Sequence, residues 1–198
     1  MSSRAATVST ADLASILEEE GFAHYGFAEL KTPVSIAFYE EWLNKGYQGE
    51  MQYLERHLLE KREPERLLKR ARTAIVVTVD YLPHPEPMET SLPHRELRGL
   101  RIAAYARGRD YHIFLRERLS RVIEKLKRLA PEEEFRAFTD SAPVLERDLA
   151  ARAGLGWVGK NTCLLNRKSG SLFFIAEIYT TLALNVATFE MPDHCGTC

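Results

Sequence analysis

The sequence has 198 residues, of which 45% are hydrophobic, and this is enough to bury the core of one large domain. Its 27 basic and 28 acidic residues nearly cancel, so the global charge gives no case for a nucleic-acid or anionic-membrane partner. The longest apolar runs, such as residues 172–176, fall far short of the roughly 18 residues that span a bilayer. No membrane partner is therefore expected, and the lack of an apolar secretory stretch at the N-terminus favours a cytoplasmic location.

The hydrophobic pattern predicts helices and strands mixed along the chain. In chain order these are a helix over 11–19, a short strand over 22–28, a helix from 33 to 44, a helix beginning at 49, a strand over 73–79, a strand over 101–107, a helix over 110–129, a strand over 135–139, a helix over 144–153 and a strand over 171–182. Four prolines between residues 83 and 93 exclude regular structure there and predict an exposed or ligand-covering loop.

Capping signals and apolar spacing support these assignments. Thr10 precedes the first helix as an N-cap, and Gly21 ends it. The helix over 110–129 carries leucines and a valine spaced by threes and fours, which form one apolar seam. The strand over 135–139 places Asp140 at its carboxyl end.

Basic residues concentrate in one part of the chain. Residues 95–128 contain eleven Lys or Arg against four Asp or Glu. Such an excess could meet a phosphate-rich partner, but a solvated helix surface is the ordinary explanation.

The glycine loop matches two nucleotide-binding motifs by letter. Residues 154–159 fit the dinucleotide fingerprint, and residues 154–160 fit a phosphate loop until Asn161 stands in place of Ser or Thr. Both motifs need a strand before the glycines and a helix after them. Here a helix precedes the loop and no helical pattern follows, so neither motif is expected to function; a C-cap glycine followed by a turn is the structural alternative.

Asp140 is the principal candidate for chemistry. It could simply cap the following helix, or it could donate a proton to a ligand bound beside the glycine loop. The second role needs a carboxyl whose pKa is raised by apolar or ligand cover. At the start of the helix predicted over 110–129, His112 follows Asp110 and Tyr111 in a turn, and a structural role is the simpler interpretation of it.

The cysteines allow several interpretations. Cys195 and Cys198, with two residues between them, are half of a zinc site, half of a cluster site, or a redox pair. A thioredoxin-like pair is disfavoured because no helix-forming segment follows Cys198. We expect Cys163 to be a small buried hydrophobic residue.

Taken in order, six segments resemble the epoxyqueuosine reductase family, the cobalamin- and iron-sulfur-dependent enzymes of queuosine synthesis in tRNA. These segments are residues 61–68 with the strand at 74–77, then 104–112, 140–147, 153–161, 170–177 and 195–198. The resemblance implies an α+β fold with a mostly antiparallel sheet flanked by helices, like that of nitroreductases. It also implies a cobalamin-binding reductase domain at residues 1–190.

The function implied by this resemblance is reduction of epoxyqueuosine to queuosine in the tRNA anticodon loop. Cobalamin would open the epoxide, [4Fe-4S] clusters would supply electrons, and Asp140 would donate a proton. The residues that would contact cobalamin are Arg62, Tyr105, Asp140, Trp157, Gly159, Lys160 and Asn161. Cys195 and Cys198 would be metal ligands.

The chain departs from the family in its cysteines. Each [4Fe-4S] cluster normally takes four thiolates, and this sequence has three cysteines in all. We therefore expect residues 191–198 to be the start of a truncated ferredoxin-like domain. We expect the chain to be inactive without the rest of that domain, and to be a monomer. Two alternatives stay open: a non-catalytic RNA-binding or zinc-binding module, and a corrinoid reductase for another substrate, such as an organohalide.

Overall fold

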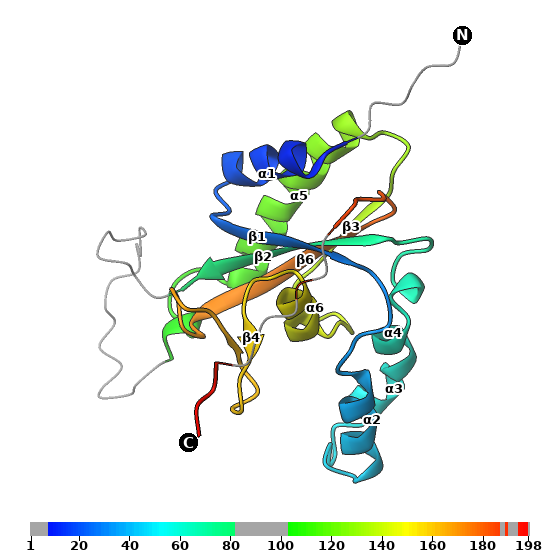
Figure 1. Ribbon diagram of the computed structural model, residues 1–198, viewed down its shortest axis with the longest axis vertical. Coiled ribbons are helices and arrows are strands. Elements are labelled where there is room, and N and C mark those ends of the chain that lie inside the picture. Colours follow the sequence, from blue (N-terminus) through cyan, green and yellow to red (C-terminus); the bar gives the residue numbers. More distant parts are fainter. Residues whose placement is uncertain (1–7, 82–102, 187–188, 190–193, 198) are drawn as a thin grey trace.

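A four-stranded antiparallel sheet organises the computed structural model, which describes residues 8–81, 103–186, 189 and 194–197. The strands are β1 (His24–Glu29), β2 (Thr73–Asp80), β3 (Phe135–Phe138) and β6 (Phe173–Thr180), in the order β1-β2-β6-β3 (Figure 1). Every neighbouring pair is antiparallel. The predicted α+β class with a mostly antiparallel sheet is therefore confirmed.

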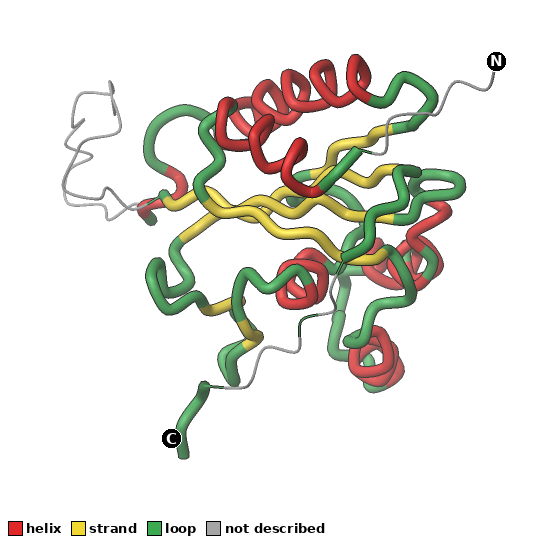
Figure 2. The backbone as a smooth tube through the Cα atoms, turned by 45° about the horizontal axis from the view of Figure 1, so that its top comes forward, coloured by secondary structure: helices red, strands yellow, loops and turns green. Residues whose placement is uncertain are grey.

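Helices cover both faces of this sheet. They are α1 (Thr10–Glu19), α2 (Ile36–Asn44), α3 (Gln52–Arg56), α4 (Leu58–Arg62), α5 (Tyr111–Leu129) and α6 (Glu146–Arg152), with 3-10 turns at Pro64–Arg66 and Ala104–Ala106. The long α5 and the shorter α1 lie side by side on one face, and α6 lies on the other (Figures 1 and 2). The helices α2 to α4 form a separate group beyond the end of β1 (Figure 1).

The two faces of β2 explain why its sequence is apolar throughout. Ile75 and Val77 pack into the core beneath α1 and α5, whereas Ala74 and Val76 pack into the core beneath α6. All four side chains are at most 1% exposed. A central strand buried on both sides cannot alternate apolar with polar residues.

The predicted apolar seam of α5 is buried along the helix except at its last position. Leu115, Leu119, Val122 and Leu126 are all at most 1% exposed, and burial of each such side chain stabilises the fold by about 1.5–3 kcal/mol. Leu129, at the end of the same spacing, is 39% exposed.

Three expectations about local structure were wrong. Ser9, not Thr10, caps α1: its hydroxyl accepts the Asp12 amide hydrogen bond while the Asp12 carboxylate accepts the Ser9 amide. The strand expected over 101–107 is instead a 3-10 turn in its described part, residues 103–107. The helix expected from 49 begins at Gln52 and is divided at His57 between α3 and α4.

The glycine loop leads from α6 into a small hairpin formed by β4 (Trp157–Val158) and β5 (Leu164–Leu165). A helix therefore precedes the glycines and a strand follows them. This order is the one that argued against a nucleotide-binding motif. The proline-rich residues 83–93 lie outside the described part of the chain.

Candidate active site

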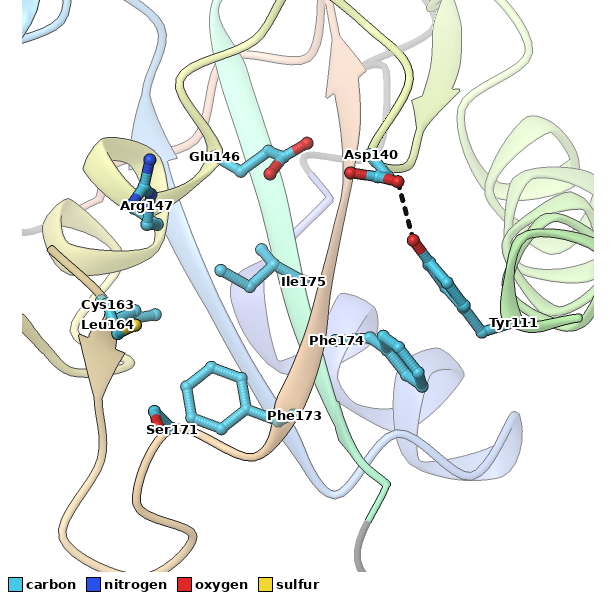
Figure 3. Close-up of a pocket in the computed structure, with 10 residues that line it drawn as sticks. All are labelled: Tyr111, Asp140, Glu146, Arg147, Cys163, Leu164, Ser171, Phe173, Phe174 and Ile175. Carbon is cyan, nitrogen blue, oxygen red and sulfur yellow. Dashed lines mark hydrogen bonds between the residues drawn. The ribbon is translucent and has the colours of Figure 1, made fainter. Parts of the chain in front are cut away.

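A cleft of about 330 Å³ opens at the end of the sheet where β6 begins, and its lining includes residues of α5, α6 and the hairpin. Phe173, Phe174 and Ile175 of β6 supply its apolar floor (Figure 3). Its other lining residues come from the start of α5, the segment after β3, the start of α6 and the hairpin (Figure 3). Elements distant in sequence thus converge on one surface, which is the usual construction of a ligand site.

Asp140 stands at the rim of this cleft. Its backbone has φ +52°, the left-handed region that Asp adopts more readily than most residues. Its Oδ2 accepts hydrogen bonds from the Tyr111 hydroxyl at 2.7 Å and meets the His112 Nε2 at 3.0 Å. The side chain is 58% exposed. Asp140 is therefore oriented by two ring groups while it remains accessible to a bound molecule.

Aromatic stacking holds these partners in place. The Tyr111 ring lies nearly parallel to that of Phe174, with centroids 4.0 Å apart and an interplanar angle of 8°. Burial, followed by the hydrogen bond to Asp140, raises the pKa of the Tyr111 hydroxyl well above its usual range. Tyr111 is consequently a neutral hydrogen-bond donor to Asp140 at neutral pH.

His112 bridges two carboxylates at the start of α5. Its Nδ1 lies 2.9 Å from Asp110, which also caps the helix by accepting the His112 amide at 2.8 Å. Burial of the ring opposes its positive charge, but the hydrogen bonds to Asp110 and Asp140 outweigh burial and raise the pKa of His112. The histidine thus has both a capping neighbour and a contact with the candidate acid.

Glu146, the first residue of α6, is a second carboxyl in the cleft. Figure 3 shows its carboxylate directed toward Asp140. Desolvation, with repulsion from Asp140, raises the pKa of Glu146 to about 7, although Arg147 and Lys61 act in the opposite direction. The sequence contained Glu146 within the 140–147 segment, but the burial that gives it this property arises only when α6 packs on the sheet.

Of the residues predicted to contact a cofactor, Asp140 lines this cleft. The others lie on different elements and are not among the residues that line it. Arg62 ends α4 and pairs with Glu40, and Tyr105 is 51% exposed with its ring edge toward Tyr81. The contacts of these residues with cobalamin therefore stay a prediction.

The hairpin turn contributes the remaining predicted residues. The Gly159 amide donates to the Cys163 carbonyl at 2.9 Å, and a Cβ on Gly159 would lie 2.5 Å from a Leu165 methyl carbon. The Asn161 side chain accepts from the Cys163 amide at 3.1 Å, while Lys160 Nζ donates to the Gly196 carbonyl at 2.7 Å. The turn is therefore closely packed and positioned by its own hydrogen bonds.

Trp157 carries an unsatisfied polar atom. Its indole Nε1 is buried and has no hydrogen-bond partner among the described residues. Its ring meets the His194 ring edge to face, with centroids 4.9 Å apart. A buried donor without a partner is uncommon, and a bound ligand is one way to satisfy it.

The two described cysteines, Cys163 and Cys195, form no disulfide. Cys163 is exposed and lines the cleft, so the expectation that it is buried was wrong: the hairpin turn projects it away from the core. Cys195 is half-buried, and Cys198 lies outside the described residues. Within the described part of the chain, no group of three or more His, Cys, Asp or Glu is arranged to hold a metal ion.

Some of the eleven basic residues in 95–128 have partners near the end of α1 or on α5 itself. On α5, Arg121 pairs with Glu20 at 2.7 Å and Lys125 pairs with Glu19 at 3.0 Å, both at the end of α1. Arg118 stacks its guanidinium over the Phe114 ring at 4.5 Å. Arg121 and Lys125 therefore face the neighbouring helix α1.

Comparison with known proteins identifies the relatives of this chain. Residues 61–141 match the family model described as "Epoxyqueuosine reductase QueG, DUF1730". The epoxyqueuosine reductase of Pseudomonas aeruginosa is 39% identical over 180 residues, which cover 91% of this chain and 49% of that protein. The chain belongs to the epoxyqueuosine reductase family. The enzyme of Cyclobacterium marinum is also 39% identical, over 90% of this chain and 54% of that protein. The chain thus spans about half the length of the curated relatives it matches.

Solved structures of the epoxyqueuosine reductase family share the fold. The enzyme from Streptococcus thermophilus superposes with a TM-score of 0.73 and 24% identity, over 95% of this chain and 50% of that one. An epoxyqueuosine reductase solved with an epoxyqueuosine-modified tRNA-Tyr stem loop gives a TM-score of 0.70 at 22% identity, over 95% of this chain and 49% of that one. A reductive dehalogenase, whose structure suggests a mechanism for B12-dependent dehalogenation, gives a TM-score of 0.55 at 17% identity, over 92% of this chain and 20% of that one.

Among the described residues, no helix has the length and apolar character needed to cross a bilayer.

Proposed function

We propose that this chain is the cobalamin-binding part of an epoxyqueuosine reductase and that Asp140 is its proton donor. The observation that carries the proposal is the placement of Asp140 at the rim of an apolar-floored cleft, oriented by Tyr111 and His112. Support comes from the family membership and from a relative solved with an epoxyqueuosine-modified tRNA stem loop. We infer the same substrate, a tRNA carrying epoxyqueuosine, for the whole protein.

The reaction converts an epoxide into an alkene and water, which consumes two electrons and two protons. Cobalamin, when bound, would supply the reducing chemistry at the epoxide carbon. The role of Asp140 is to place a proton on the epoxide oxygen as its C–O bond breaks, because an alkoxide is a far poorer leaving group than an alcohol. Tyr111 and His112 hold the acid toward the cleft.

Several features of this chain suit a broad, amide-fringed ligand such as a corrin. The cleft has an apolar floor, and the hairpin that lines it also carries Trp157, whose buried indole donor has no partner among the described residues. We propose that Arg62, Tyr105 and the turn at residues 159–161 contact the ligand around this cleft. Backbone groups in a tight glycine turn can approach such a ligand closely.

The cysteine donor set does not suit a complete iron-sulfur cluster in this chain alone. The sequence has three cysteines, and Cys163 lies on the hairpin turn that lines the cleft. We propose that Cys195 and Cys198 contribute to a cluster completed by further cysteines, in a ferredoxin-like region beginning at residues 191–198. Residues 1–190 would then be the cobalamin-binding domain, inactive in turnover without that electron supply. We expect it to act as a monomer in the cytoplasm.

Cobalamin titration tests the binding proposal. Adding cobalamin to the folded chain should move its visible spectrum toward that of a species without the lower axial base. A spectrum that stays unchanged, at concentrations where the far-ultraviolet circular dichroism shows a folded chain, would contradict corrinoid binding.

Replacement of Asp140 tests its role. In a fusion that restores a cluster domain, Asp140→Asn should keep cobalamin binding and lower turnover by about 10²–10⁴-fold, the usual contribution of a positioned general acid. Full epoxide reduction by this variant would remove Asp140 from the mechanism.

Two other functions remain to be distinguished. The likeness to a reductive dehalogenase shows a shared fold, so an aryl halide should be offered to the reduced protein beside the modified tRNA. A non-catalytic RNA-binding or zinc-binding module would instead bind without turnover. Phosphate-dominated RNA binding weakens by roughly 0.7–0.9 log units per log unit of salt for each contact, whereas corrinoid binding should respond little.

A further inference from the structure

A second buried carboxyl lies behind the cleft. Glu177 is 0% exposed in the middle of β6, and neither of its carboxylate oxygens has a hydrogen-bond partner among the described residues. A charged carboxylate without partners in such a place would cost several kcal/mol, so the neutral acid is favoured. Desolvation, and then repulsion from Glu146, raise the pKa of Glu177 well above its usual range.

Strand pairing brings this carboxyl toward the candidate acid. Glu177 stands opposite Phe138 in the ladder between β6 and β3, and Asp140 follows two residues after Phe138. Alternation along β6 puts Glu177 on the same face as Ile175, which lines the cleft. The helix α6, which begins with Glu146, packs on that face. The carboxyls of Asp140, Glu146 and Glu177 therefore lie in sequence from the rim of the cleft into the core.

The proposed reaction creates a need for such an arrangement. Two protons must reach the same oxygen, the first as the epoxide opens and the second as the oxygen leaves as water. In the proposed reaction, Asp140 gives the first proton to that oxygen. A second acid within reach must restore it while the substrate covers the cleft.

We propose that Glu146 passes a proton to Asp140 during the reaction and that Glu177 keeps a further protonated carboxyl behind it. This inference rests on the proposed function. The O–H bond of Glu146 breaks as the O–H bond of Asp140 forms, directly or through one water, and Glu146 is left as the carboxylate. Solvent or Glu177 then reprotonates Glu146. No electron is transferred in these steps.

The surroundings of Glu146 allow it to exist in both states. Its titratable and charged neighbours are Lys61 of α4, Tyr111 of α5, Asp140 after β3, Arg147 of α6, and Glu177 and Tyr179 of β6. Lys61 and Arg147 stabilise the carboxylate that donation leaves behind. Burial and Asp140 stabilise the protonated form, so neither state is locked.

Titration of the chain itself tests the arrangement. Among the carboxyl carbon resonances of ¹³C-labelled glutamate, one should titrate near pH 7. This resonance should be missing in Glu146→Gln, and its titration midpoint should move to lower pH in Asp140→Asn. The matched control is Glu132→Gln, at an exposed position in the turn before β3, which should leave that resonance in place. The inference would be overturned if Glu146 titrated at the same pH as the exposed glutamates, or if Asp140→Asn left its titration midpoint unchanged. Either result would count whatever the epoxide-reducing activity of the protein.

The pH dependence of turnover tests proton transfer, in a fusion that restores a cluster domain. Glu146→Gln should be slower than the unmodified protein by about tenfold near pH 6, where Glu146 is protonated, and the ratio should approach one near pH 8.5. A merely structural role would give the same ratio at every pH and would contradict proton transfer. If the unmodified fusion binds no cobalamin and reduces no epoxide, the proposed function fails, and the titration still decides whether the coupled carboxyls exist.

Discussion

Replacing Glu146 with glutamine should change how the stability of the chain depends on pH. The side chain of Glu146 is mostly buried, and its pKa rises from 4.5 to about 7 on folding, chiefly through desolvation. Between these two values the folded chain keeps the proton while the unfolded chain has lost it. The free energy of unfolding therefore falls as pH rises through this window, and it falls no further above about pH 7.

The size of the effect follows from the shift. At roughly 1.4 kcal/mol for each pKa unit, the change from 4.5 to about 7 amounts to a loss of about 3 kcal/mol by pH 8. Glutamine has a similar shape and does not titrate. The Glu146→Gln variant should thus match the unmodified chain near pH 4.5 and be more stable by about 2–3 kcal/mol near pH 8.

Urea unfolding at a series of pH values measures this difference, with far-ultraviolet circular dichroism as the signal. Glu177 also favours its protonated form in the fold, but it is present in both proteins and its contribution largely cancels in the comparison. Glu132→Gln provides a control with the same chemical change at an exposed position, and its curve should follow that of the unmodified chain. Parallel curves for Glu146→Gln and the unmodified chain would refute the assignment of a raised pKa to Glu146.

Three further substitutions test the fold and the site. Leu119→Ala, in the fully buried seam of α5, should lower the free energy of unfolding by about 2–5 kcal/mol in urea denaturation, and a loss below 1 kcal/mol would contradict the packing described. Gly26→Ala should cost about 1–3 kcal/mol or more in the same assay, because its Cβ would lie 2.1 Å from the Ala153 carbonyl oxygen; an unchanged midpoint would show that α6 does not approach β1 so closely. In the fusion that restores a cluster domain, Tyr111→Phe removes one hydrogen bond to Asp140 and should slow turnover by about tenfold, or about 1.4 kcal/mol, with cobalamin binding kept; equal rates would exclude this role.

The sequence by itself determined the elements whose signals are local. Periodicity defined α5, β-branched residues defined β2, and the strand before Asp140 was predicted to end at Thr139, next to its observed end at Phe138. The order of a helix, glycines and no following helix was enough to reject a nucleotide-binding motif. The family resemblance also came from segments that can be read directly along the chain, because motif residues keep their spacing whatever they contact.

Tertiary structure decided the chemistry of individual groups. The strand expected at 101–107 became a turn, since its alternating residues have no neighbouring strand to pair with in the described structure. Cys163 became exposed because the hairpin directs it into the cleft. The functional interest of Glu146 and Glu177 depends on burial and on repulsion between carboxyls from different elements. A sequence states which residues can ionise, but their ionisation is set by the water and charges that packing removes or brings near, and those come from segments far apart in the chain.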